Sequence, residues 1–250
     1  MEKRMIKNSA GQDIATVVHF AKEVKGLAVL CPGYLDTKDY AHLVNLAEAL
    51  SGAGYDAVRF DPTGTWESGG TIAEYKPTQY LADIGSVIDC MVANKAYPQV
   101  ILCGHSRGGT LSVFYAAHDP RISFVAAIMS NAVSGRPDDK WKTTGIRFST
   151  RDIPGKIGSV KEFRVPYHYK EDLDRYDVNG AVSRLKIPLL FMAGERDDKI
   201  TPEKVRVFYE RANGQKSFFI VPGAVHDYRR NPQWIATVNE KILEKVKKLG

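Results

Sequence analysis

Apolar and polar positions along this chain follow two different rhythms. Amphipathic spacing, marked by Leu81, Ile84 and Val87, predicts a helix over 78–93, and further helices are expected at 41–50, 110–117, 203–212 and 240–248. Between them lie short apolar runs with the length of buried strands, at 27–30, 55–59, 99–102, 124–130, 187–194 and 216–223. This alternation predicts an α/β fold with a mostly parallel central sheet and helices on both faces. An extended run at 14–20 is expected to add an antiparallel edge.

Composition and charge narrow the class of protein. With 250 residues, 44% hydrophobic and 26% charged, the chain has the size and composition of one soluble globular domain, residues 1–250. The first residues turn polar at once, and no apolar run approaches the roughly 18 residues that span a bilayer, so we expect a cytoplasmic protein without a membrane partner. The net charge of +6 comes from basic residues interleaved with acids, without a nucleic-acid-binding motif, so nucleic acid is not an expected partner.

Cysteines and histidines give no sign of a metal centre. Cys31, Cys90 and Cys103 cannot all pair, and two of them lie in or beside expected strands, so free thiols in a reducing compartment are expected. No Cys-x-x-Cys or His-x-x-x-His spacing occurs among the three cysteines and six histidines. The sequence therefore predicts no metal site.

A Gly-x-Ser-x-Gly motif lies where a strand-like run passes into a helix-like one. It runs from Gly104 to Gly108, with His105, Ser106 and Arg107 between them. In this context the motif is typical of a nucleophile elbow, in which the glycines allow a sharp turn and the serine hydroxyl points into a cleft. The alternative is that Ser106 only caps the following helix. His105 is expected to pack beside the elbow, within reach of a substrate.

A serine hydroxyl becomes a good nucleophile only beside a base that is itself oriented by an acid. Asp197 and Asp198 lie in the loop after the expected strand 187–194, and His226 lies in the loop after the expected strand 216–223. The order Ser, Asp, His, with each residue at the carboxyl end of a strand, is the order of a catalytic triad in α/β-hydrolases. The sequence therefore supplies a complete candidate triad.

These motifs resemble those of the α/β-hydrolase superfamily, and within it the small bacterial esterases of the cinnamoyl or feruloyl esterase type, which are also similar to the catalytic domains of prolyl-oligopeptidase-like peptidases. The resemblance covers most of the chain, and it implies the α/β-hydrolase fold. Ser106 matches the family's nucleophile and His226 its base. Asp197 follows Gly194 by three residues, as the acid does in the family pattern Gly-x-x-Asp, so we interpret Asp198 as a solvated surface carboxylate.

The resemblance also implies an oxyanion hole built from two backbone amides. The first is the amide of Arg107, the residue after the nucleophile, and the second is expected in the loop after the strand at 27–30. Gly33 lies where the family's His-Gly glycine falls, so Tyr34 N–H is the second candidate donor, and Gly33 itself is expected to border the substrate. Pro32 replaces the usual histidine, a change that alters the loop without removing its amide.

Two segments are expected around the entrance to the site. Trp66 lies in a loop that resembles the family turn Asp-x-x-Gly-x-Gly-x-Ser and is expected to contact substrate, although a plain turn held by Asp61 is an equal alternative. More than 50 residues separate the expected strands 124–130 and 187–194, far more than an ordinary connection. Because the family inserts a lid at this position, we expect a cap at about 132–183.

The expected cap is aromatic and basic. It contains Trp141 and Tyr169, and from Arg136 to Lys170 it carries nine Lys or Arg residues against four Asp or Glu residues. One interpretation is a pocket roof, with Trp141 and Tyr169 in contact with an aryl or carboxylate-bearing ester. The other is a lid that uses its aromatic residues for its own small core.

The predicted activity is that of a serine carboxylesterase. Ser106 would attack a small or aromatic, hydroxycinnamate-like ester to form an acyl-enzyme, with His226 as base and without a cofactor. A peptidase or thioesterase with the same triad is the first alternative, because fold and triad do not determine the leaving group. A binding protein with an unused triad is the second. The expected partner is a small-molecule ester, and the sequence does not determine the oligomeric state.

Overall fold

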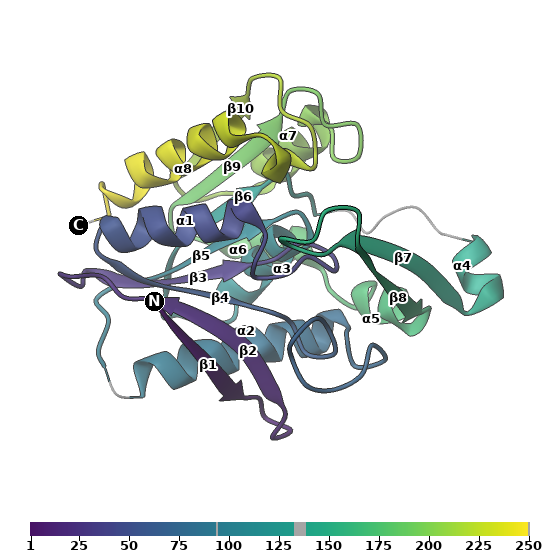
Figure 1. Cartoon of the computed structure of the whole chain (residues 1–250). Helices are drawn as coiled ribbons and strands as arrows, with labels where there is room; N and C mark the ends of the chain where they lie inside the picture. Colours follow the sequence, from purple (N-terminus) through teal and green to yellow (C-terminus); the bar gives the residue numbers. More distant parts are fainter. Residues whose placement is uncertain (94, 133–138, 250) are drawn as a thin grey trace.

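One twisted sheet forms the centre of the molecule. In the computed structural model, which describes residues 1–93, 95–132 and 139–249, eight strands lie in the order β1-β2-β4-β3-β5-β6-β9-β10 (Figure 1). Pairing is parallel from β4 to β10, whereas β2 pairs in antiparallel register with both β1 and β4. The strands are β1 (Glu2–Lys7), β2 (Asp13–His19), β3 (Gly26–Cys31), β4 (Tyr55–Phe60), β5 (Val100–His105), β6 (Ile122–Ile128), β9 (Leu189–Gly194) and β10 (Lys216–Val221).

Helices cover both faces of this sheet. Helices α1 (Ala41–Gly52) and α8 (Pro232–Val246) lie side by side on one face, and α2 (Pro77–Val92), α3 (Arg107–Ala116), α6 (Val178–Arg184) and α7 (Pro202–Arg211) pack on the other (Figure 1). Successive residues of β3 therefore enter different cores: Leu27 joins one, and Ala28 joins the other. Burial on both sides explains why the parallel strands appear in the sequence as continuous apolar runs.

The connection from β6 to β9 packs against the same core as the helices on one face of the sheet. Its described part contains α4 (Asp139–Thr144), the antiparallel hairpin of β7 (Ile146–Asp152) and β8 (Val160–Pro166), α5 (His168–Leu173) and α6. Figure 1 shows the hairpin standing to one side of the central sheet. Trp141 Nε1 donates to the Val165 carbonyl oxygen at 3.0 Å, which ties α4 to β8. Residues 133–138 of the expected cap lie outside the described residues.

The predicted α/β-hydrolase fold, with its mostly parallel sheet, is confirmed. The strand expected at 14–20 is β2, but β1 lies outside it and forms the true edge. The expected helix at 240–248 is the second half of α8, which begins at Pro232 because the Asn231 side chain accepts from the Gln233 amide at 2.9 Å. In the described ranges, no helix combines the length and the apolar character needed to cross a bilayer.

Candidate active site

Ser106 lies at a strained turn between β5 and α3. Its φ of 50° is left-handed, a conformation that costs a non-glycine residue about 1–3 kcal/mol. The turn packs so tightly that a Cβ on Gly108 would lie 2.1 Å from the Cys31 carbonyl oxygen. The Ser106 amide donates to the Ile128 carbonyl oxygen at 2.8 Å, and its own carbonyl accepts from Ser130 Oγ at 2.9 Å. These bonds to β6 and its end hold the strained turn in place.

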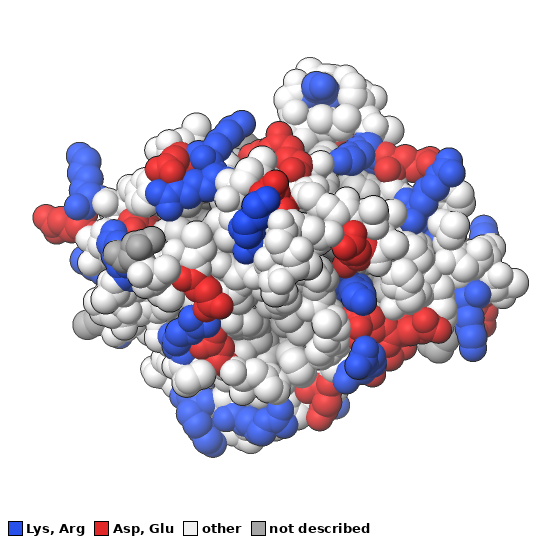
Figure 2. Space-filling view, turned by 90° about the horizontal axis from the view of Figure 1, so that it is seen from below, with Lys and Arg blue, Asp and Glu red and all other residues white. Residues whose placement is uncertain are grey.

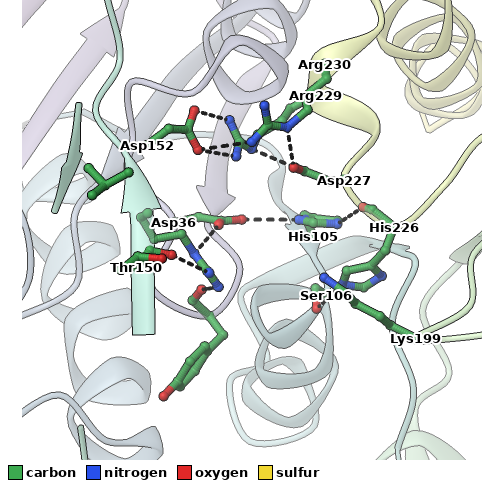
Figure 3. A pocket seen from close by; sticks show the side chains of 13 residues that line it. Asp36, His105, Ser106, Thr150, Asp152, Lys199, His226, Asp227, Arg229 and Arg230 are labelled. Carbon is green, nitrogen blue, oxygen red and sulfur yellow. Dashed lines mark hydrogen bonds and ion pairs between the residues drawn. The ribbon is translucent and has the colours of Figure 1, made fainter. Parts of the chain in front are cut away.

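Two hydrogen bonds link the candidate nucleophile, base and acid. His226 Nε2 lies 3.0 Å from Ser106 Oγ, and His226 Nδ1 lies 2.7 Å from Asp197 Oδ2 (Figure 3). The other carboxylate oxygen of Asp197 accepts from the backbone amides of Lys199 and Ile200, at 2.9 and 2.8 Å. The Asp197 side chain has no exposed surface. Three residues that are widely separated in the sequence are thus brought into one hydrogen-bonded line.

The environment of His226 keeps its imidazole neutral near pH 7. Burial lowers the pKa of His226 below its usual 6.5, and the hydrogen bond that its ring donates to Asp197 only partly opposes this effect. Asp198 is exposed, and within the described part of the chain it has no bond to His226. Ser106 gives no side-chain hydrogen bond to the first turn of α3 in the described structure, so helix capping does not account for it.

The two expected oxyanion donors come from two different parts of the chain. Arg107 is the first residue of α3, and Tyr34 lies in the loop after β3. Neither amide N–H has a hydrogen-bond acceptor among the described residues. Gly33 fits closely, because a Cβ there would lie 2.5 Å from Asp36 Oδ2 and 3.1 Å from His105 Nδ1. The loop therefore depends on glycine at this position.

His105 connects two loops of the site. One follows β3, carries Gly33 and Tyr34 and is called the oxyanion loop; the other follows β10, carries His226 and is called the histidine loop. Its Nε2 lies 3.1 Å from the His226 carbonyl oxygen and its Nδ1 lies 3.4 Å from Asp36 Oδ2 (Figure 3). Burial alone would raise the pKa of Asp36, but the hydrogen bond and charge of His105 lower it to about 2, so this carboxylate is ionised. His105 thus packs beside the elbow, as expected, and reaches the pocket wall.

A cavity of about 480 Å³ opens at Ser106. It is bordered by residues from the oxyanion loop, the elbow, the β7–β8 hairpin and the loops that carry Asp197 and His226. Its lining comprises Tyr34, Asp36, His105, Ser106, Thr150, Arg151, Asp152, Val160, Lys199, His226, Asp227, Arg229 and Arg230.

Most of the charged residues in this lining were not predicted from the sequence. Lys199 and Arg229 follow Asp197 and His226 closely in the sequence, which is a signal that could have found them, whereas nothing local indicates that a hairpin residue reaches the site.

Three aromatic residues expected to contact substrate lie away from this lining. Trp66 Nε1 donates to the Leu35 carbonyl oxygen at 2.9 Å, and its ring packs against Phe163 of β8. Trp141 and Tyr169 are buried and stack on each other with ring centroids 6.1 Å apart. They belong to the packing between the β6–β9 connection and the sheet, so substrate contact by these three residues stays a prediction.

One cluster has the residue types of a metal site. In the described part of the chain, the ligating atoms of Asp36, His42 and His105 all lie within 4.8 Å of one another. Tetrahedral zinc would bring such atoms to roughly 3.4 Å. Both ring nitrogens of His105 already face other partners, and burial lowers the pKa of His42 to about 3 without giving its ring a partner. The absence of a metal site therefore stays a prediction.

The family model described as serine aminopeptidase, S33, matches residues 22–182. The chain belongs to this α/β-hydrolase family. Mouse mitochondrial palmitoyl-protein thioesterase ABHD10 is 24% identical to this hydrolase over 187 residues, which is 71% of the chain but only 61% of that relative's length.

Solved structures show the same fold. Est1E from Butyrivibrio proteoclasticus with bound ferulic acid superimposes with a TM-score of 0.78 at 19% identity, over 98% of this hydrolase and 100% of that chain. Mouse α/β-hydrolase domain-containing protein 10 gives 0.81 at 20% identity, over 100% of both chains.

Proposed function

We propose that this protein is a serine esterase, with Ser106 as nucleophile, His226 as general base and Asp197 as the acid that orients it. The observation that carries the proposal is the position of the His226 ring, 2.7 Å from Asp197 and 3.0 Å from Ser106. These separations are short enough for direct proton transfer and for fixing the tautomer of the base. The lowered pKa of His226 keeps the base neutral at pH 7.

The proposed reaction proceeds through an acyl-enzyme. His226 takes the Ser106 proton as the hydroxyl oxygen attacks the carbonyl carbon, and it then gives that proton to the departing alcohol. The amides of Tyr34 and Arg107 hydrogen-bond to the oxyanion, a contribution of roughly 3–4 kcal/mol for each such donor. Water then repeats the sequence on the acyl-enzyme, which regenerates Ser106. No cofactor takes part in these steps.

The proposed substrate is a small ester, with hydroxycinnamate-like aromatic esters as one group to test. The fold-level similarity to Est1E with ferulic acid supports the aromatic group. A thioesterase is the second candidate, supported by the 24% identity to a palmitoyl-protein thioesterase, and a peptidase is the third, supported by the family description.

We also propose that the connection at 132–183 acts as a cap within a single domain, since Thr150 and Val160 of the hairpin line the cavity. Nucleic acid and membranes are not proposed as partners. On the face drawn in Figure 2, basic and acidic side chains are intermingled. A cytoplasmic location remains a proposal, to be tested by fractionating cells that express the tagged protein.

Labelling with a fluorophosphonate probe, together with 4-nitrophenyl acetate turnover, tests the nucleophile. The Ser106→Ala variant is expected to lose labelling and turnover, while Ser86→Ala, which removes a hydroxyl bonded within α2, retains both. Full turnover by Ser106→Ala would refute the assignment. A panel of methyl ferulate, short alkyl esters, an acyl thioester and an aminoacyl 4-nitroanilide then ranks the three candidate activities.

A further inference from the structure

The cavity at Ser106 has a polar wall. Of its thirteen lining residues, only Tyr34 and Val160 offer sizeable apolar surface, and charged side chains predominate. A long alkyl chain placed here would displace water from ionised groups and meet few apolar side chains, which is unfavourable. The lining therefore favours a short substrate with polar substituents near the scissile bond.

The acidic members of the wall are already neutralised by neighbours. Asp152 accepts two hydrogen bonds from Arg229, at 2.6 and 2.9 Å, and Asp227 lies 2.6 Å from the same guanidinium (Figure 3). Arg230 adds contacts at 2.7 Å to Asp227 and 3.4 Å to Asp152. Asp36 faces His105 on one side. The positive charges of Arg229 and Arg230 are thus compensated by protein carboxylates.

One cation of the wall is unpaired. Lys199 Nζ has no hydrogen-bond or ion-pair partner among the described residues, and in Figure 3 its side chain lies beside Ser106 and His226, away from the Asp152–Arg229 cluster. Arg151, in contrast, binds the carbonyl oxygens of Tyr34 and Thr150 through its two terminal nitrogens, at 2.6 and 3.1 Å, and its buried Nε forms an ion pair with Asp36 at 3.5 Å.

The charged residues of the lining indicate the charge of the substrate. Four cationic residues, Arg151, Lys199, Arg229 and Arg230, face three acidic ones, Asp36, Asp152 and Asp227. Counted over the Lys, Arg and Asp side chains of the lining, one positive charge remains uncompensated, and Lys199, the unpaired cation of the lining, borders the cavity that contains the Ser106 hydroxyl. A single carboxylate would balance this charge and accept the remaining hydrogen bonds.

We propose that the natural substrate is an ester that carries a carboxylate close to its scissile bond, held by Lys199. This inference rests on the proposed esterase function and specifies its substrate class. Lys199 is then a specificity-determining residue, and Arg151 holds the oxyanion loop through the Tyr34 carbonyl oxygen.

Two acetate esters of one size test this proposal. 4-Acetoxybenzoate carries the carboxylate and 4-acetoxybenzamide is its neutral partner, and both form the same acetyl-enzyme. After division by their spontaneous hydrolysis rates, kcat/KM is expected to favour the anion by about tenfold at low salt, and the ratio should shrink as ionic strength rises. The ratio cancels any change in the reactivity of Ser106 itself.

The variants locate the effect. Lys199→Gln should lower the anion-to-neutral ratio by roughly threefold to fivefold, the size of one partly exposed charge pair, and Lys199→Glu should lower it further. Lys247→Gln removes the same charge at a distant groove beside α1 and should leave the ratio unchanged. If wild type hydrolyses both esters without preferring the anion, or if Lys247→Gln acts like Lys199→Gln, the inference fails while the esterase assignment stands. If neither ester reacts and Ser106 does not label, both fail.

Discussion

Replacing Asp197 by asparagine should nearly abolish turnover while leaving the fold intact. Asp197 Oδ1 accepts two backbone amides, from Lys199 and Ile200, so an asparagine keeps its carbonyl oxygen there and turns its NH₂ group toward His226. That group can only donate, so His226 Nδ1 must become the acceptor and the ring proton moves to Nε2. Nε2–H then points at Ser106 Oγ, 3.0 Å away, and cannot accept the serine proton.

The expected size of this effect is about 10⁴-fold in kcat, the loss seen when a buried triad aspartate is changed in this way. At 1.36 kcal/mol for each factor of ten, this corresponds to about 5 kcal/mol of transition-state stabilisation. Stability should change by only about 1 kcal/mol or less, because the two backbone hydrogen bonds remain. Asp197 has no exposed surface, so solvent cannot replace the lost carboxylate oxygen.

The assay compares Asp197→Asn with Asp198→Asn by 4-nitrophenyl acetate turnover and thermal unfolding. Both variants remove one negative charge, at adjacent positions, but Asp198 is exposed and lies outside the hydrogen-bonded line. Asp198→Asn should retain kcat within about twofold. Retention of a tenth or more of wild-type kcat by a folded Asp197→Asn, or an equal loss in Asp198→Asn, would refute the reasoning.

Three further predictions concern the same region. Because burial lowers the pKa of His226, kcat/KM for a neutral ester should fall as the pH is lowered, with an apparent pKa below 6.5. A midpoint above pH 7 would contradict the inference that burial dominates the pKa of His226. Arg229→Met should cost about 2 kcal/mol of unfolding free energy in urea, since it removes the largely buried guanidinium shared by Asp152 and Asp227 and leaves them only Arg230. Arg230→Met, whose side chain is 63% exposed, should cost about 0.5 kcal/mol or less. Gly33→Ala should lower kcat by roughly ten- to 100-fold, because the added Cβ displaces the oxyanion loop. Gly52→Ala is the control, since a Cβ there meets nothing within 4 Å and should leave kcat unchanged. Equal activity of the two variants would show that the loop tolerates a Cβ at Gly33.

The parallel part of the sheet could be predicted because its strands are buried on both faces. Strand β1 could not, since five of its six residues are at least partly exposed and only Ile6 is buried. An edge strand needs one hydrogen-bonded neighbour but no continuous apolar run. The β7–β8 hairpin escaped for a related reason: burial alternates along both strands, but the apolar residues Ile146, Phe148 and Val160 lie at exposed positions, so residue type does not follow burial.

Prediction of the site was strongest where backbone topology places the residues. Ser106, Asp197 and His226 each follow a parallel strand, and the carboxyl ends of parallel strands meet at one edge of the sheet, so their order in the sequence was enough to bring them together. The charged wall depends instead on long side chains from a connection with no family pattern. Arg151 reaches the Tyr34 carbonyl oxygen across 117 positions of sequence, a contact that no local signal records.

The ties between the hairpin and the reaction centre limit how a substrate can enter. Arg151 bonds to the carbonyl of Tyr34, whose amide is a proposed oxyanion donor, and Asp152 bonds to Arg229, three positions after His226. Swinging the hairpin outward would break both ties together, and it would release the oxyanion loop and the histidine loop at the same moment. Because wide opening along that route would take the proposed reaction centre apart, we expect turnover of molecules small enough to pass with the hairpin in place.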